Sequence, residues 1–298
     1  MAPENLFAGS YLDRRAEARL DGNWLAEARG DAHTLYVAMR HGAALVRQVL
    51  PGAPRLALLH GTDARVEAVQ DPESLVLLGW YEERCCVLVD LPDHAPGIER
   101  DGEALSELRP IAAELPVNEA GLFAYARALN LWRGNHRYCS RCGTSMQSER
   151  AGHLRRCPAC DYQSFPRLDP AIIVLVHDGD AVLLGRQAGW PPGRYSTIAG
   201  FVEPGESLED AVKREVFEET GVIARDIAYH SSQPWPFPSS LMLGFTAMAA
   251  MTTPVLRDGE LEDARWFSRE ELRNGTVGLP PAISISRHLI ESWLQHAA

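Results

Sequence analysis

The segment from residue 200 to residue 222 constrains this chain most, because it joins clear helix signals to an unusual arrangement of acidic side chains. Ser207 is a suitable N-cap, and Asp210 lies three residues later, as in a capping box. Gly221 is a suitable C-cap, since glycine readily adopts the left-handed backbone that ends many helices. These signals predict a helix over residues 208–220.

The acidic residues of this helix are not placed as on an ordinary surface helix. At about 100° per residue, one narrow stripe contains Leu208, Val212, Glu215 and Glu219, with Glu218 on its flank. Carboxylates beside an apolar surface repel each other and lose hydration, and a divalent cation relieves both costs. A solvated helix held by ion pairs would keep its acids off the apolar stripe. Oxygen ligands favour Mg²⁺ or Mn²⁺ over zinc, and such ions polarise phosphoryl oxygens and activate water.

This segment resembles the Nudix box at every defined position, in the pattern Gly200-x5-Glu206-x7-Arg214-Glu215-Val216-x-Glu218-Glu219-x-Gly221-Val222. The resemblance implies an α+β chain with a Nudix fold, in which a mixed sheet lies between helices. It also implies that Arg214 pairs with Glu206 and braces the loop. The catalytic metals would be held by Glu215, Glu218, Glu219, a downstream Glu260 and the backbone carbonyl of Ala199, and Glu219 is the candidate base.

Four cysteines form two Cys-x2-Cys pairs, Cys139 with Cys142 and Cys157 with Cys160. Paired knuckles at this separation are typical of one tetrahedral zinc ion, whereas four unrelated buried thiols would not share the spacing. Sulfur would fill all four positions, so the predicted zinc is structural. The adjacent Cys85 and Cys86 lie in a strand-like run and are expected to be small buried residues.

The cysteine segment is basic although the whole chain carries a formal net charge of −11. Two interpretations stay open: a solvated arginine face, or a patch that attracts a polyanion such as RNA. If the segment is an RNA-binding patch, Arg155 and Arg156 should face solvent. A further alternative is that these two arginines pair with acids of the N-terminal domain or of a partner subunit. The arginines concerned are Arg133, Arg137, Arg141, Arg150, Arg155, Arg156 and Arg167.

A second segment, residues 232–240, has the sequence Ser-Gln-Pro-Trp-Pro-Phe-Pro-Ser-Ser. Its prolines stiffen the backbone and its two aromatic rings suit stacking on a flat base. From physical chemistry alone, a proline-rich core loop is an equally good interpretation.

The Nudix box, the four cysteines and the segment 232–240 occur in one chain. Together they resemble the NADH pyrophosphatase family of Nudix enzymes. The resemblance implies hydrolysis of NAD(H) to AMP and nicotinamide mononucleotide, a homodimer, and NAD-capped RNA as a second substrate. It implies that Phe165 and Phe201 sandwich a base, with Phe165 contributed by the partner subunit. Gly152 departs from the resemblance, because some members carry a glutamate near the substrate at this position. The other implied substrate-binding residues are Gln233, Pro234, Trp235, Pro236, Phe237, Pro238, Ser239, Ser240, Ser286 and Arg109.

The 298 residues accommodate several units. We expect a strand-rich N-terminal domain over residues 1–132 that ends in a helix over 117–132, a zinc ribbon over 133–168 and a catalytic domain over 169–298. No apolar run spans a bilayer and no signal peptide is recognised. Because a disulfide framework would fit a short secreted chain and not one of this length, the cysteines favour a reducing, cytoplasmic setting. Two rival functions remain: a Nudix pyrophosphatase for ADP-ribose or another nucleotide, and a nucleic-acid-binding zinc-ribbon protein with an inactive Nudix domain.

Overall fold

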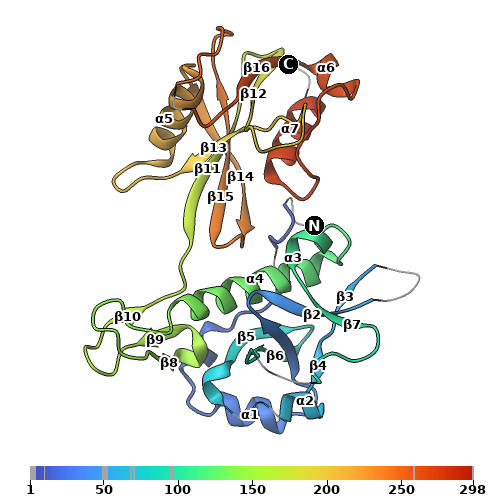
Figure 1. Ribbon diagram of the computed structural model, residues 1–298, viewed down its shortest axis with the longest axis vertical. Helices are drawn as coiled ribbons and strands as arrows, with labels where there is room; N and C mark the ends of the chain where they lie inside the picture. The colour runs from blue at the N-terminus through green and yellow to red at the C-terminus, as the bar shows by residue number, and fades with distance from the viewer. Residues whose placement is uncertain are drawn as a thin grey trace. The chain divides into compact units, whose positions relative to one another are not determined.

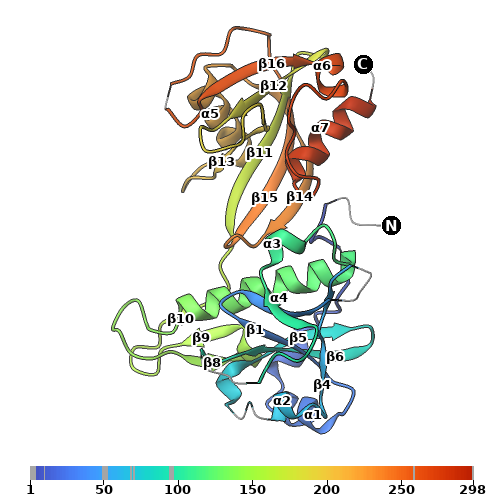
Figure 2. The ribbon, with the colours of Figure 1, turned by 45° about the vertical axis from the view of Figure 1, so that its right-hand side comes forward.

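The computed structural model describes residues 5–9, 11–48, 53–67, 69, 71–93, 97–257 and 259–296. These residues form two compact units (Figures 1 and 2). The C-terminal unit is made of the described residues in 5–8, 168–235 and 240–296. The N-terminal unit is made of those in 9–167 and 236–239.

The sheet of the C-terminal unit has six strands, in the order β14-β15-β11-β12-β16 with β13 beside β11. The strands are β11 (Asp169–His177), β12 (Ala181–Arg186), β13 (Ile198–Phe201), β14 (Arg225–Trp235), β15 (Ser240–Met248) and β16 (Asp263–Ser268). β11 is parallel to β15 and antiparallel to β12 and β13. The sheet is therefore mixed, as the resemblance implied.

Both faces of β11 are buried, which explains why its sequence is a continuous apolar run. The even-numbered residues join helix α5 (Leu208–Thr220) in one core, which includes Ile172, Val174, Val212 and Val216. The odd-numbered residues join helix α7 (Ile285–Gln295) in a second core, which includes Ile173, Leu175, Leu289 and Trp293. The sheet thus lies between α5 and α7 (Figure 1), and the short helix α6 (Arg269–Arg273) follows β16.

The N-terminal unit contains a seven-stranded sheet in the order β3-β2-β1-β6-β5, with β4 beside β1 and β7 beside β2. The strands are β1 (Leu35–Arg40), β2 (Ala43–Arg47), β3 (Arg55–Leu56), β4 (Leu59–His60), β5 (Leu75–Tyr81), β6 (Arg84–Asp90) and β7 (Glu103–Ser106). Cys86 is completely buried in β6 and Cys85 is partly buried, as expected for small apolar residues. The strand-rich prediction for this region is confirmed.

Helix α4 (Val117–Asn135) packs on this sheet and ends three residues after the predicted helix (Figure 2). The other helical segments of the unit are short: η1 (Ala16–Leu20), α1 (Trp24–Gly30), α2 (Ala64–Glu67), η2 (Pro72–Ser74) and α3 (Leu108–Ile111). A small sheet of β8 (Gln147–Glu149), β9 (Leu154–Arg156) and β10 (Gln163–Ser164) follows α4 and includes the turn η3 (Arg150–Gly152).

Two features of the observed units differ from the expected organisation. Residues 5–8 pack with the C-terminal unit, where Asn5 Nδ2 donates to Ser231 Oγ at 2.9 Å, although the sequence placed them in the N-terminal domain. The cysteine segment belongs to one compact unit with the N-terminal sheet. Among the described helices, none is long and apolar enough to cross a membrane.

Candidate active site

Helix α5 begins and ends at the predicted residues. The Ser207 hydroxyl accepts a hydrogen bond from the Asp210 amide at 3.2 Å, which satisfies one of the free N–H groups of the first turn. Gly221 has φ +69° and its amide donates to Phe217 O at 2.8 Å. Glu219 is buried on the face that packs against the sheet, Glu215 lies at the edge of that face, and Glu218 is half exposed.

Arg214 lies at the centre of the acidic side chains. Its Nε donates to Glu206 Oε1 at 2.6 Å and one Nη donates to Glu206 Oε2 at 2.9 Å. The other Nη donates to Glu215 at 2.8 Å and to Glu218 at 3.0 Å. The guanidinium holds the pKa of Glu206 at about 2. The Arg214–Glu206 pair that the resemblance implied is present and fixes the loop that leads into α5.

Glu215 occupies a space that exists only because residue 200 is glycine. A Cβ built on Gly200 would lie 1.9 Å from the Glu215 carboxyl carbon and 2.1 and 2.2 Å from its oxygens. The carboxylate is therefore held against the backbone of β13, directly after Ala199. Burial raises the pKa of Glu215, Arg214 opposes that rise, and the negative charges of Glu218 and Glu260 add to it.

Glu260 comes from a different part of the chain, the loop between β15 and β16. This loop is tied to the C-terminal end of α5, because the Val255 amide donates to Thr220 O at 2.8 Å. Crowded carboxylates beside a backbone strand are a donor set that suits a hard divalent cation. The residues present therefore fit such an ion. The glutamates are not gathered as tightly as metal-bound ligands, since Arg214 lies among them.

The segment 232–240 forms the hairpin between β14 and β15, with Trp235 opposite Ser240 and Pro234 opposite Leu241. Gln233 is completely buried: its Nε2 donates to Leu6 O and to Ile283 O, and its Oε1 accepts from the Ile285 amide. Gln233 therefore behaves as a residue of a core loop. Its side-chain amide hydrogen-bonds to the N-terminal segment and to the segment that leads into α7. The partly buried Trp235 ring lies 6.2 Å from that of Phe7.

The tip of this hairpin, residues 236–239, packs in the N-terminal unit. Arg127 Nε donates to Pro236 O at 3.0 Å. The Arg109 guanidinium lies 4.5 Å from the centre of the Phe237 ring. Arg109 and Phe237, both expected near substrate, are thus brought together. Pro238 is exposed and Ser239 is partly exposed at the same tip.

Phe201 and Ser286 have opposite exposures. The Phe201 side chain is 61% exposed at the end of β13, beside the loop that Arg214 braces. Ser286 is 1% exposed, and its Oγ accepts hydrogen bonds from the Thr197 amide at 3.1 Å and the Thr197 hydroxyl at 2.8 Å. Phe201 is therefore free to stack on a base, whereas Ser286 anchors the strand that carries Ala199 and Gly200.

The four cysteines come together as a set of ligands. Their Sγ atoms all lie within 4.8 Å of one another, a property unique to this set among the described groups of His, Cys, Asp and Glu. Individual Sγ–Sγ distances are 3.4 to 3.6 Å, near the roughly 3.8 Å edge of a tetrahedron with Zn–S bonds of about 2.3 Å. The two knuckles have the same turn geometry. The Cys139 amide donates to Thr144 O and the Cys157 amide donates to Tyr162 O, each at 2.8 Å. The site fits structural zinc.

The arginines near this site are mostly used inside the protein. Arg133 is 1% exposed and donates to Ser148 Oγ, Gly152 O and Glu73 O. Arg155 is 8% exposed and donates to Glu73 Oε2 at 2.8 Å. Arg156 pairs with Glu149 and Asp161. The interpretation of Arg155 and Arg156 as an exposed RNA-binding patch is therefore wrong, because one is buried and both are neutralised by acids.

Three family models match successive parts of the chain. The NADH pyrophosphatase-like rudimentary NUDIX domain matches residues 33–132, the NADH pyrophosphatase zinc ribbon domain matches 135–165, and the NUDIX domain matches 167–291. The human NAD-capped RNA hydrolase NUDT12 is 34% identical over 342 residues, covering 98% of this chain and 74% of the relative.

The chain belongs to the NADH pyrophosphatase family of Nudix hydrolases.

Bacterial members are also similar to this Nudix hydrolase. The NAD-capped RNA hydrolase NudC of Pseudomonas aeruginosa strain LESB58 is 44% identical over 216 residues, covering 72% of this chain and 74% of the relative. That of Mycobacterium bovis strain BCG / Pasteur 1173P2 is 42% identical over 201 residues, covering 63% of this chain and 64% of the relative.

One feature of this family member was not recognised in the sequence. The N-terminal sheet matches a rudimentary Nudix domain, and like the catalytic sheet it contains a parallel pair, β1 with β6, among antiparallel strands. Gly152 has φ +93°, and a Cβ there would lie 2.7 Å from the Val76 side chain. A glutamate at position 152 would therefore meet both strained backbone and the Val76 side chain.

Proposed function

We propose that this chain is an NAD(H) diphosphatase that cleaves NAD(H) to AMP and nicotinamide mononucleotide, and that it also removes NAD caps from RNA. The observation that carries the proposal is the complete acidic set of α5, with Glu219 buried and Glu215 held in the space left by Gly200. The Nudix and NADH pyrophosphatase matches, and relatives named as NAD-capped RNA hydrolases, support the substrate class.

The reaction is hydrolysis of one phosphoanhydride bond. Water oxygen forms a bond to one phosphorus, and the bridging oxygen leaves with the other phosphate. Mg²⁺ or Mn²⁺, held by Glu215, Glu218, Glu219, Glu260 and the Ala199 carbonyl, would neutralise the diphosphate and activate that water. Glu219 is the side chain that we propose to accept the proton of the attacking water.

The other site residues position the substrate. Arg214 holds the loop before α5, Ser286 anchors the strand before Gly200, and the exposed Phe201 ring stacks on a base. Phe165 and the hairpin of residues 233–240 with Arg109 supply further substrate contacts. We propose in addition that the protein acts as a homodimer in the cytoplasm. Its three functional parts would be the N-terminal domain over residues 1–132, the zinc ribbon over 133–168 and the catalytic domain over 169–298.

Replacing Glu219 by Gln tests this function. The change keeps the side-chain size and removes the charge that a cation and a proton acceptor need, so kcat for NADH should fall about 10²–10⁴-fold with the fold intact. Glu209→Gln is the matched control, since Glu209 is an exposed acid on the same helix. A Glu219→Gln enzyme with more than a tenth of wild-type turnover at saturating Mg²⁺ or Mn²⁺ would contradict the assignment.

A further inference from the structure

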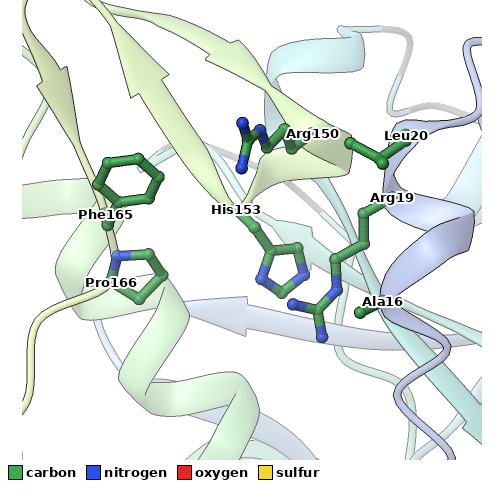
Figure 3. Close-up of a pocket in the computed structure, with 7 residues that line it drawn as sticks. All are labelled: Ala16, Arg19, Leu20, Arg150, His153, Phe165 and Pro166. Carbon is green, nitrogen blue, oxygen red and sulfur yellow. The ribbon is translucent and has the colours of Figure 1, made fainter.

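A hollow of about 320 Å³ in the N-terminal unit is lined by Ala16, Arg19, Leu20, Arg150, His153, Phe165 and Pro166. Figure 3 shows Phe165 and Pro166 on one side of it, Arg19 and Leu20 on the other, and His153 between them. Its volume lies within the roughly 300–1,000 Å³ typical of small-molecule sites. The lining residues include two guanidinium groups and no carboxylate.

The positive charge of this hollow is not neutralised by neighbouring acids. Among the residues that the structure describes, none accepts a hydrogen bond from the Arg150 side chain or forms an ion pair with it. Arg19 donates to the Tyr125 hydroxyl at 3.5 Å, and its buried Nε has no acceptor. A guanidinium carries five N–H donors arranged for phosphate oxygens. The two arginines therefore offer unused donors at one place in a protein with net charge −11.

The backbone that presents Arg150 is strained. Arg150, Ala151 and Gly152 have φ values of +50°, +51° and +93° in succession. Left-handed backbone at residues other than glycine costs about 1–3 kcal/mol, and such strain persists where the surrounding structure imposes it, often at ligand sites. The turn is fixed by its neighbours: His153 Nε2 donates to Leu77 O at 2.8 Å and Gly152 lies against Val76. The backbone of Arg150 is thus held in place, while its side chain is exposed.

From these features we infer that the hollow binds a backbone phosphate of RNA between Arg19 and Arg150. The inference rests on the proposed removal of NAD caps. The phosphate cannot be the scissile one, because the hollow has no carboxylate to hold the metal that cleavage needs. It must belong to the strand that follows the cap. The Phe165 ring, 51% exposed on the same hollow, is one of the proposed substrate contacts, so the hollow lies beside the place expected for the cap.

Charge reversal at Arg150 tests this site with two independent readouts. The first is the binding of a labelled single-stranded oligoribonucleotide without a cap, which needs no catalysis. The second is kcat/KM on NAD-capped RNA compared with NADH. Removing a charge-assisted hydrogen bond to phosphate should weaken oligoribonucleotide binding and kcat/KM on capped RNA about tenfold each in Arg150→Glu, and change NADH hydrolysis less than about twofold. The logarithm of turnover on capped RNA should also fall less steeply with the logarithm of salt concentration. The slope should decrease in magnitude by about one for each phosphate that the variant no longer neutralises.

The matched control is Arg84→Glu, which makes the same charge change on an exposed surface pair with Glu82 in the same unit. It should leave both substrates unaffected. Arg19→Ala, a milder change, should weaken oligoribonucleotide binding in the same direction as Arg150→Glu. Unchanged oligoribonucleotide binding, equal losses on NADH and capped RNA, or the same loss in Arg84→Glu would each overturn the inference. Failure of the proposed function is separate, since it would show as a wild-type protein that does not hydrolyse NADH.

Discussion

Gly200 lies directly against the Glu215 carboxylate, so adding a single methyl group at this position should displace a metal-binding side chain. In Gly200→Ala the new Cβ would lie 1.9 Å from the carboxyl carbon of Glu215, whereas Cβ contacts under 3.0 Å are essentially never observed. The Glu215 carboxylate must therefore retreat by about 1 Å or more. Gly200 pairs with Ile172 in regular strand geometry and has no left-handed backbone, so alanine meets no backbone penalty there.

Displacing a metal-binding carboxylate by this distance should cost about 10²-fold in kcat, the loss that a misplacement of about 1 Å can cause. Steady-state turnover of NADH at saturating Mg²⁺ or Mn²⁺ measures it, with thermal unfolding as the check on the fold. Gly189→Ala is the matched control, because no atom lies within 4 Å of a Cβ at that position. A folded Gly200→Ala enzyme that keeps kcat within about threefold of wild type would refute the role given to the Gly200 space.

Three further predictions concern zinc, base stacking and pH. Cys157→Ser should lower zinc content from the expected one ion per chain and destabilise the N-terminal unit, measured by elemental analysis and thermal unfolding; a zinc-free wild type purified without chelators would contradict this. Phe201→Ala should lower kcat/KM for NADH by about one to two orders of magnitude, since stacking on a base contributes roughly 1–3 kcal/mol; an unchanged kcat/KM would show that the ring is not a stacking partner. Burial lowers the pKa of His153 to about 4 from its ordinary 6.5, so the unfolded chain binds the extra proton first and stability should fall as pH drops from about 6.5 toward 4. His153→Gln should flatten that dependence between pH 7 and 5 in denaturant titrations, and an unaltered slope would contradict the assignment.

Local signals in the sequence predicted the elements that carry the catalytic groups. The caps Ser207 and Gly221 set the bounds of α5 because capping depends on residues adjacent in the chain. The apolar run of β11 is buried on both faces, under α5 on one and α7 on the other. The cysteine spacing defined the ribbon because each knuckle is a short local turn.

Contacts between distant parts of the chain could not be predicted in this way. Gln233 reads as part of a substrate motif, but its hydrogen bonds to Leu6 and Ile283 bury it. Arg155 reads as a surface cation until Glu73, 82 residues away, is placed beside it. The space at Gly200 depends on how α5 packs on β13. Each of these outcomes is set by tertiary packing, which periodicity and spacing do not encode.

Product analysis of NADH hydrolysis tests the central claim most directly. The purified protein is incubated with NADH, ADP-ribose and NAD-capped RNA at saturating Mg²⁺ or Mn²⁺, and the products are separated by chromatography. We predict AMP and reduced nicotinamide mononucleotide from NADH in equal amounts, a 5′-monophosphate RNA from the capped strand, and slower turnover of ADP-ribose. No cleavage of NADH, or preferred cleavage of ADP-ribose, would contradict the account.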